Sequence, residues 1–252
     1  MSSAKSATGN VKKAREFSLR VSASLLMAVA LGATSAGAVP LGGSSYQQEF
    51  GLAQCTMSPS GRNPFFVLEP GYQLVLEGDD KRLEITVLNE IKVLDGITTR
   101  IVEEREWSDG KLSEVARNYY AICEQTKDVF YFGEEVDFYE NNKVTSHKGT
   151  WLAGQNGAKA GLMMPGAPKV GMKYYQEIAP DVAMDRAEIV SLDAPCKTPA
   201  GTFTKCLKTK EQASLDFWSS LKFWDVEYKI YAPGIGLVQD QELVLTKYGF
   251  VK

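Results

Sequence analysis

Residues 72–87 read Tyr-Gln-Leu-Val-Leu-Glu-Gly-Asp-Asp-Lys-Arg-Leu-Glu-Ile-Thr-Val, and this stretch decides the fold class. Apolar side chains recur at every second position before the Gly-Asp-Asp segment and again after it. A period of two is typical of a β-strand with one buried face. Two such runs joined by a tight turn predict an antiparallel hairpin.

The same alternation continues beyond this hairpin. Ile91 and Val93 resume the phase after the polar Asn89, which predicts one long strand with a bulge near Asn89. Asp95-Gly96 then marks a second hairpin turn, because both residue types tolerate positive φ. The sequence therefore predicts sequential antiparallel neighbours in this region.

Residues 97–107 form the next predicted strand, which reaches the Asp109-Gly110 turn. Ile97, Thr99 and Ile101 share one face of this strand. The other face is expected to be in contact with solvent, because it carries three charged side chains: Arg100, Glu104 and Glu106.

Further alternating runs extend this pattern over the rest of the chain. They occupy residues 112–124, 129–132, 136–140, 144–151, 172–178, 187–192, 202–211, 224–231 and 237–247. Residues 152–171 are rich in Gly, Ala and Pro and read as a long crossing loop, whereas residues 213–223 fit either a strand or a turn or two of helix. The predicted fold is all-β: a curved antiparallel meander sheet or partial barrel of about 11–12 strands.

Residues 196–206 read Cys-Lys-Thr-Pro-Ala-Gly-Thr-Phe-Thr-Lys-Cys and predict a hairpin closed by its own disulfide. Pro and Gly favour the turn, which brings the two cysteines across from each other. A bridge between Cys196 and Cys206 leaves Cys55 to pair with Cys123. Because Phe203 and Leu207 alternate with Cys206, the Cys196–Cys206 bridge is expected on the wetter face of the hairpin.

The N-terminal residues predict export. Five of the 28 basic residues precede an apolar run at 21–32 that is too short to span a bilayer, and residues 36–38 read Ala-Gly-Ala. We expect residues 1–38 to be a signal peptide cleaved near Ala38, residues 39–62 to be a flexible arm, and residues 63–252 to be a single β domain. The mature protein would be periplasmic or secreted, without a transmembrane span. A lipid anchor at Cys55 is the less favoured alternative, because Gln54 is large for that position.

Several motifs resemble those of a family of uncharacterised secreted bacterial β-rich proteins, over residues 63–240. The motifs are Asn63-Pro64-Phe65-Phe66, Tyr131-Phe132-Gly133-Glu134, Met164-Pro165, Thr198-Pro199-Ala200-Gly201-Thr202-Phe203 and Tyr231-Ala232-Pro233-Gly234-Ile235-Gly236-Leu237-Val238. The chain is also similar to lipoprotein-carrier-type half-barrels, in which a half-open barrel covers an apolar groove. The resemblance implies a secreted β fold and no activity for individual residues.

An excess of large apolar side chains predicts a binding site. Residues expected to flank an apolar ligand are Met163, Met164, Phe217, Trp218, Phe223 and Trp224. The alternative is that the aromatic cluster closes the open side of the sheet as core. The favoured function is a non-enzymatic binder of an apolar small molecule or of an envelope protein in the concave face. Nucleic acid is not expected as a partner, since the mature chain is acidic.

Other site chemistries are weaker on sequence grounds. His147, the single histidine, and nearby methionines could bind copper, although a surface histidine and core methionines are the plainer interpretation. The carboxylates of Glu134, Glu135, Asp137 and Glu140 could bind calcium or, with Glu103, act in a secreted hydrolase, but acidic runs are ordinarily solvated. No catalytic nucleophile, cofactor or phosphate motif stands out, so no catalytic residue, metal ligand or cofactor is assigned.

Overall fold

The computed structural model describes residues 45–215 and 223–251, which form β-strands, turns and one 3₁₀ turn (Leu52–Gln54). No α-helix occurs among these residues. The strands in chain order are β1 (Met57–Ser58), β2 (Gly61–Asn63), β3 (Phe66–Leu68), β4 (Tyr72–Gly78), β5 (Lys81–Leu94), β6 (Ile97–Ser108), β7 (Lys111–Cys123), β8 (Val129–Glu140), β9 (Lys143–Ser146), β10 (Trp151–Leu152), β11 (Lys159–Met164), β12 (Lys173–Tyr175), β13 (Glu177–Ile178), β14 (Arg186–Thr198), β15 (Gly201–Leu215), β16 (Phe223–Ala232), β17 (Gly236–Asp240) and β18 (Leu243–Phe250).

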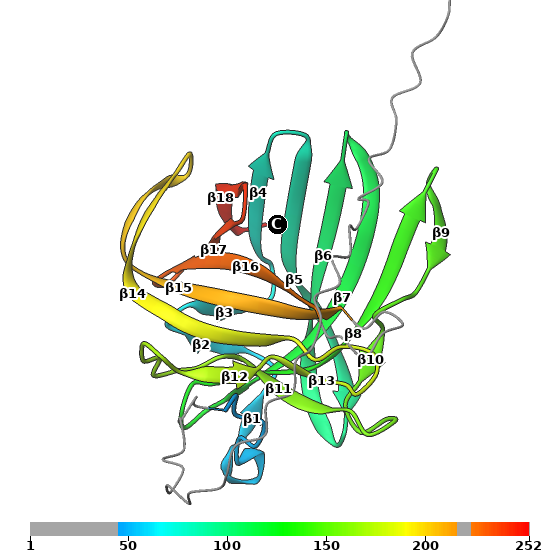
Figure 1. Ribbon diagram of the computed structural model, residues 1–252, viewed down its shortest axis with the longest axis vertical. Coiled ribbons are helices and arrows are strands. Elements are labelled where there is room, and N and C mark those ends of the chain that lie inside the picture. The colour runs from blue at the N-terminus through cyan, green and yellow to red at the C-terminus, as the bar shows by residue number, and fades with distance from the viewer. Residues whose placement is uncertain (1–44, 216–222, 252) are drawn as a thin grey trace, which may run out of the picture. The chain divides into compact units, whose positions relative to one another are not determined.

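A sixteen-stranded antiparallel sheet curls until it is nearly closed into a barrel with one seam (Figure 1). Its order is β12-β14-β15-β16-β17-β18-β4-β5-β6-β7-β8-β11-β13, with β1, β9 and β10 attached to β7 and β8. The two ends of this path, β12 and β13, are separated in sequence by Gln176 alone. One short segment therefore pairs with β14 on one edge and with β11 on the other. The predicted all-β class and antiparallel meander are confirmed.

The predicted hairpin turns lie where the sequence places them. Asp95 and Gly96 connect β5 to β6 with φ of 47° and 77°, and Asp109 and Gly110 connect β6 to β7 with φ of 51° and 71°. Positive φ at both central residues matches the right-handed twist of the flanking strands. The predicted bulge is also confirmed, because the pairing of β5 with β6 shifts register between Val87 and Ile91.

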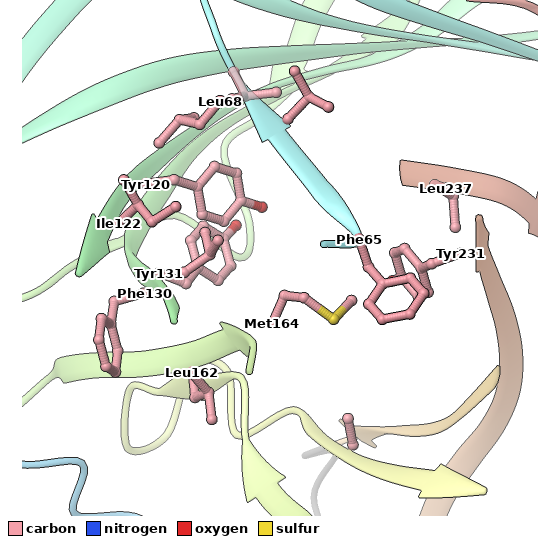
Figure 2. Packing of buried hydrophobic residues seen from close by; sticks show 14 of the residues in the cluster. Phe65, Leu68, Tyr120, Ile122, Phe130, Tyr131, Leu162, Met164, Tyr231 and Leu237 are labelled. Atoms are coloured by element: carbon pink, nitrogen blue, oxygen red, sulfur yellow. The ribbon is translucent and has the colours of Figure 1, made fainter. Parts of the chain in front are cut away.

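The inside of the barrel holds most of the buried apolar side chains. A separate hairpin of β2 and β3 packs against the inner face of the sheet and contributes Phe65, Val67 and Leu68 to the core. Figure 2 shows Met164 between the pair Tyr120 and Tyr131 and the group formed by Phe65, Tyr231 and Leu237. The hairpin is fixed in place through Asn63, whose side-chain amide donates to the carbonyl oxygens of Lys127 (2.7 Å) and Pro165 (3.1 Å).

Both predicted disulfides, Cys55–Cys123 and Cys196–Cys206, are present. They indicate an oxidising environment outside the cytoplasm. The prediction that Cys196–Cys206 lies on the wetter face is wrong, since Cys206 is fully buried. The cause is Lys205, whose φ of 57° belongs to a bulge, so that Cys206 and the adjacent Leu207 are both buried instead of alternating.

Two segments without predicted strands take part in the sheet. Residues 152–171 contain β11, which pairs with β8 and β13 and thereby shortens the predicted crossing loop. Of the predicted arm at 39–62, the described part is residues 45–62. It bridges to β12 at Gln47, pairs with β7 through β1, and is bound to β7 by the Cys55–Cys123 disulfide. The described chain contains no helix of the length and apolarity needed to cross a bilayer.

Candidate functional site

The inner face of the barrel encloses an apolar cavity of about 70 Å³. Its walls come from strand β3 of the β2–β3 hairpin and from β4, β5, β6, β16 and β17. The inward-facing side chains, at every second position of these strands, converge on the cavity. The apolar lining residues are Phe66, Val67, Tyr72, Leu74, Leu83, Ile85, Val87, Val102, Tyr120, Met163, Tyr231 and Leu237.

A second cavity of about 160 Å³ adjoins the first one and is acidic. Four side chains line both spaces: Glu104, Tyr120, Met163 and Lys229. The second cavity is lined by six carboxyl groups and a single lysine. The carboxyl groups belong to Glu104, Glu114, Glu134, Glu177, Asp185 and Glu211, and the lysine is Lys229.

Strand pairing explains how these acids reach the interior. Glu104 on β6 lies opposite Ile85 on one side and Ala116 on the other, and all three side chains share the concave face. The expectation that the face of Arg100 and Glu104 contacts solvent is wrong. Glu104 lines both cavities, while Arg100 is buried and donates to the carbonyl oxygen of Pro59 at 2.9 Å. Glu106, at the end of β6, is exposed as expected.

Among the described residues that line the two cavities, Lys229 on β16 is the only lysine or arginine. Its ammonium lies 3.4 Å from a carboxylate oxygen of Glu211 and 3.4 Å from one of Asp240. Burial opposes the charged form, but the charges of Glu211 and Asp240 hold the Lys229 pKa well above its ordinary value. Lys229 is therefore protonated and is held between two carboxylates.

Burial raises the pKa values of four other interior glutamates. Burial, the largest cause, raises the pKa of Glu104 to about 7, that of Glu114 to about 7 and that of Glu134 to about 8. Burial and the neighbouring charge of Glu134 also raise the pKa of Glu177 well above its ordinary value. The like charges in one cavity add to this effect, because each ionised carboxylate disfavours ionisation of the next.

A line of aromatic rings runs from the apolar cavity into the acidic one. The rings of Phe66 and Tyr120 meet edge to face at 5.2 Å, and Tyr120 stacks on Tyr131 at 4.7 Å. Trp151, which pairs with Glu134 across β8 and β10, meets Tyr131 edge to face at 5.4 Å. The acidic cavity thus has the aromatic rings of Tyr120 and Tyr131 in its wall beside the carboxyl groups.

Two buried polar atoms in the described residues have no hydrogen-bond partner: the indole nitrogen of Trp151 and the hydroxyl of Tyr174. Tyr174 is opposite Ala187, and Ala187 is opposite Glu211, so Tyr174 shares the concave face with Glu211. An unpaired buried hydroxyl costs roughly 1–3 kcal/mol.

The chain matches no family model, no curated protein and no solved structure. The resemblance to secreted bacterial β-rich proteins and to lipoprotein carriers therefore stays a prediction. The fold and the interior chemistry are the observations on which a function can be argued.

Of the six residues predicted to bind a ligand, the structure places one, Met163, in the walls of the two cavities. Met163 lines both cavities, whereas Met164 is fully buried in the core beside them. Phe217 and Trp218 lie outside the described residues. Phe223 and Trp224 begin strand β16, opposite Leu215 and Ser214, and their side chains are outside the described part of the structure.

The predicted acidic group divides between the two faces of the sheet. Glu134 faces the interior, whereas Glu135 pairs with Lys92 at 2.7 Å and Asp137 pairs with His147 at 2.8 Å. His147 itself has a side chain that is 70% exposed. In the described parts of the chain, no three or more His, Cys, Asp or Glu side chains converge in a way that could hold a metal ion.

The sequence interpretation missed most of the interior polar residues: Glu104, Glu114, Glu177, Glu211 and Lys229. A signal was present for Glu104, because it is in phase with Val102 on an alternating strand. The alternation shows that Glu104 and Val102 lie on the same face of the strand. Whether that face points into the barrel depends on the direction in which the sheet curves.

Proposed function

We propose that the protein binds a small molecule with an apolar part inside its barrel. The supporting observation is the apolar cavity between the β2–β3 hairpin and the inner faces of β4, β5, β6, β16 and β17. Ligand sites commonly have such a form, in which an apolar concavity contains a few convergent polar groups. Here Glu104, Lys229 and Asp240 are those polar groups, and Glu104 and Lys229 also line the acidic cavity.

The size of the cavity restricts the ligand. An engineered cavity of about 150 Å³ lined by apolar side chains accepts benzene. At about 70 Å³, the apolar cavity holds fewer carbon atoms than that. The ligand we propose therefore has a short alkyl chain or a small ring in the apolar cavity, and its remaining atoms extend into the acidic one.

A tryptophan scan of β5 tests this proposal. Ile85 faces the cavity, and its neighbour Thr86 faces outward, where it accepts a hydrogen bond from Gln73 at 3.0 Å. Ile85→Trp fills the cavity, so we expect it to abolish the methyl chemical-shift changes that hexanol, whose chain can extend from the apolar cavity into the acidic one, causes at Val87 and Leu237 in NMR titrations. Thr86→Trp should retain them. Absence of any hexanol-dependent shift in the wild-type protein contradicts the proposal.

A carboxylate-dependent hydrolase is the second candidate, and the interior position of Glu134 favours it. A carboxylic acid with a pKa of about 8 can donate a proton at neutral pH. If the protein hydrolyses aryl glycosides, Glu134→Gln should lower the rate about 100-fold or more, while Glu135→Gln, on the opposite face, should leave it unchanged. Lack of turnover by the wild-type protein would leave ligand binding as the proposed function.

A further inference from the structure

We infer that the ligand of the barrel is an organic cation, with an ammonium group in the acidic cavity and its apolar part in the adjoining one. This inference rests on the proposed function and specifies the chemical class of ligand. It follows from the composition of the acidic cavity, the aromatic faces in its wall and a buried hydroxyl without a partner.

Charge is the first argument. Six carboxyl groups and one lysine line the acidic cavity. That lysine, Lys229, is already placed between Glu211 and Asp240 at 3.4 Å from each. An anionic ligand such as a fatty acid would find no uncommitted cation among the residues that line the cavity, and it would meet several acids. A cation instead compensates Glu104, Glu114, Glu134 and Glu177, because the one lysine in the cavity wall is already committed to Glu211 and Asp240.

The aromatic wall is the second argument. Tyr120 and Tyr131 stack on each other and both line the acidic cavity. Aromatic faces attract ammonium groups through the ring quadrupole, with roughly 0.5–2 kcal/mol per contact depending on desolvation. Carboxylates and aromatic rings in one wall form a site for an alkylammonium group, because the rings also contact the adjacent methylene groups.

The third argument is independent of the acids. The Tyr174 hydroxyl is buried, and it is directed to the concave face that carries Glu211 and Tyr231, whose own hydroxyl lies 3.3 Å from Glu211. Tyr174 has no hydrogen-bond partner in the described structure. Tyr174 does not line the acidic cavity itself, but it shares the concave face with Glu211, which does. An ammonium group bound at Glu211 would therefore be the nearest available donor for the Tyr174 oxygen.

Proton linkage follows from this assignment. The groups that face one another across the acidic cavity are Glu104 (β6), Glu114 (β7), Glu134 (β8), Glu177 (β13), Asp185, Glu211 (β15) and Lys229 (β16), with Asp240 (β17) beside Lys229. Several of these acids are partly protonated at neutral pH. A bound cation favours their ionised forms, so its affinity should rise with pH between about 6 and 8.

The test compares three probes of equal chain length: hexylammonium, hexanol and hexanoate. Binding to the full-length protein is measured by calorimetry at about pH 8.5, which is above the pKa values of Glu104, Glu114 and Glu134. We expect hexylammonium to bind at least about tenfold more tightly than hexanol, and hexanoate to bind most weakly. The double variant Glu134→Gln/Glu177→Gln should reduce the preference for hexylammonium over hexanol to about threefold or less.

Glu135→Gln is the control for the Glu134 position, because it removes one carboxyl group from the opposite face of the same strand, and it should keep the full preference. Thermal melting of each variant confirms that it is folded. If hexanol binds as tightly as hexylammonium, the cation inference is overturned and the proposed binding function stands. If none of the three probes binds, both are overturned. An equal loss of preference in Glu135→Gln would also overturn the inference, since it would show an effect of net charge alone.

Discussion

Glu134 and Glu135 are adjacent on β8, yet their carboxyl groups lie in opposite electrostatic environments. Burial raises the pKa of Glu134 to about 8 in a cavity shared with other acids. Glu135 faces outward; burial opposes its ionisation, but hydrogen bonds from Lys92 and Tyr119 lower its pKa below the usual value. Neighbouring residues of a strand point to opposite faces of the sheet. For this reason ionised Glu134 destabilises the fold, whereas ionised Glu135 stabilises it.

We therefore expect Glu134→Gln to stabilise the protein in a pH-dependent way. The pKa of Glu134 is about 8 in the folded state and 4.5 in the unfolded state. The protein is therefore most stable at pH values below the unfolded-state pKa, and this stability is lost as the pH rises through the folded-state pKa. The variant should match the wild type near pH 4 and exceed its unfolding free energy by up to about 5 kcal/mol at pH 9, since each unit of pKa difference corresponds to about 1.4 kcal/mol. Urea unfolding at several pH values measures this difference, and a constant difference from pH 4 to 9 contradicts it.

The hairpin of β14 and β15 shows how one bulge changes the role of a whole element. Lys205 in a left-handed conformation turns Cys206 into the core, where Leu207 also packs. The Cys196–Cys206 bridge is consequently part of the hydrophobic core and is not an external brace. Its contribution combines loop-closure entropy with buried apolar contact.

Removal of this bridge should destabilise the protein strongly. For the double variant Cys196→Ala/Cys206→Ala we expect a loss of about 3 kcal/mol in the free energy of unfolding, from a closed loop of 10 residues. Denaturant titration measures it. Thr204→Ala, at an exposed position of the same hairpin, is the control and should change the stability by less than about 0.5 kcal/mol. A loss below about 1 kcal/mol in the double variant would show that the bridge is peripheral.

At the scale of the whole molecule, the barrel is completed by the short segment from β12 to β13. The backbone amides of Gln176 and Glu177 donate to the carbonyl oxygen of Asp185, at 2.8 and 3.1 Å, next to the start of β14. On the other side, β13 pairs with β11, and Gly161 of β11 approaches the Gln176 backbone closely. This closure brings Glu177 into the same cavity as Glu104 and Glu134.

Gly161→Ala should open this closure. A Cβ atom at position 161 would lie 2.1 Å from the carbonyl oxygen of Gln176, so β11 and the segment at 176 must move apart. We expect a loss of about 3 kcal/mol or more in stability together with faster hydrogen exchange in β12 and β13. Gly96→Ala is the control, because a Cβ there meets open space and only its φ of 77° costs energy, about 1 kcal/mol. Equal effects of the two substitutions would contradict the role of Gly161.

The sequence by itself determined most of the long strands, their turns and the Cys196–Cys206 pair, but not β1 or β11. The determined features are local: an alternating run such as 72–87 specifies a strand, Asp95-Gly96 specifies the turn that follows, and two cysteines flanking a Pro-Ala-Gly turn lie within bonding distance. Even the bulge near Asn89 could be read from the interruption of the period.

Only the tertiary structure decided which face of each strand became the interior. Alternation places Glu104 and Val102 on one face, but both a convex and a concave face are compatible with that pattern. The curvature depends on pairing between strands far apart in the chain, such as β4 with β18, and it brings Glu104 near Lys229 of β16. The acidic cavity therefore arises from residues far apart in the chain, and no local pattern of the sequence contains it.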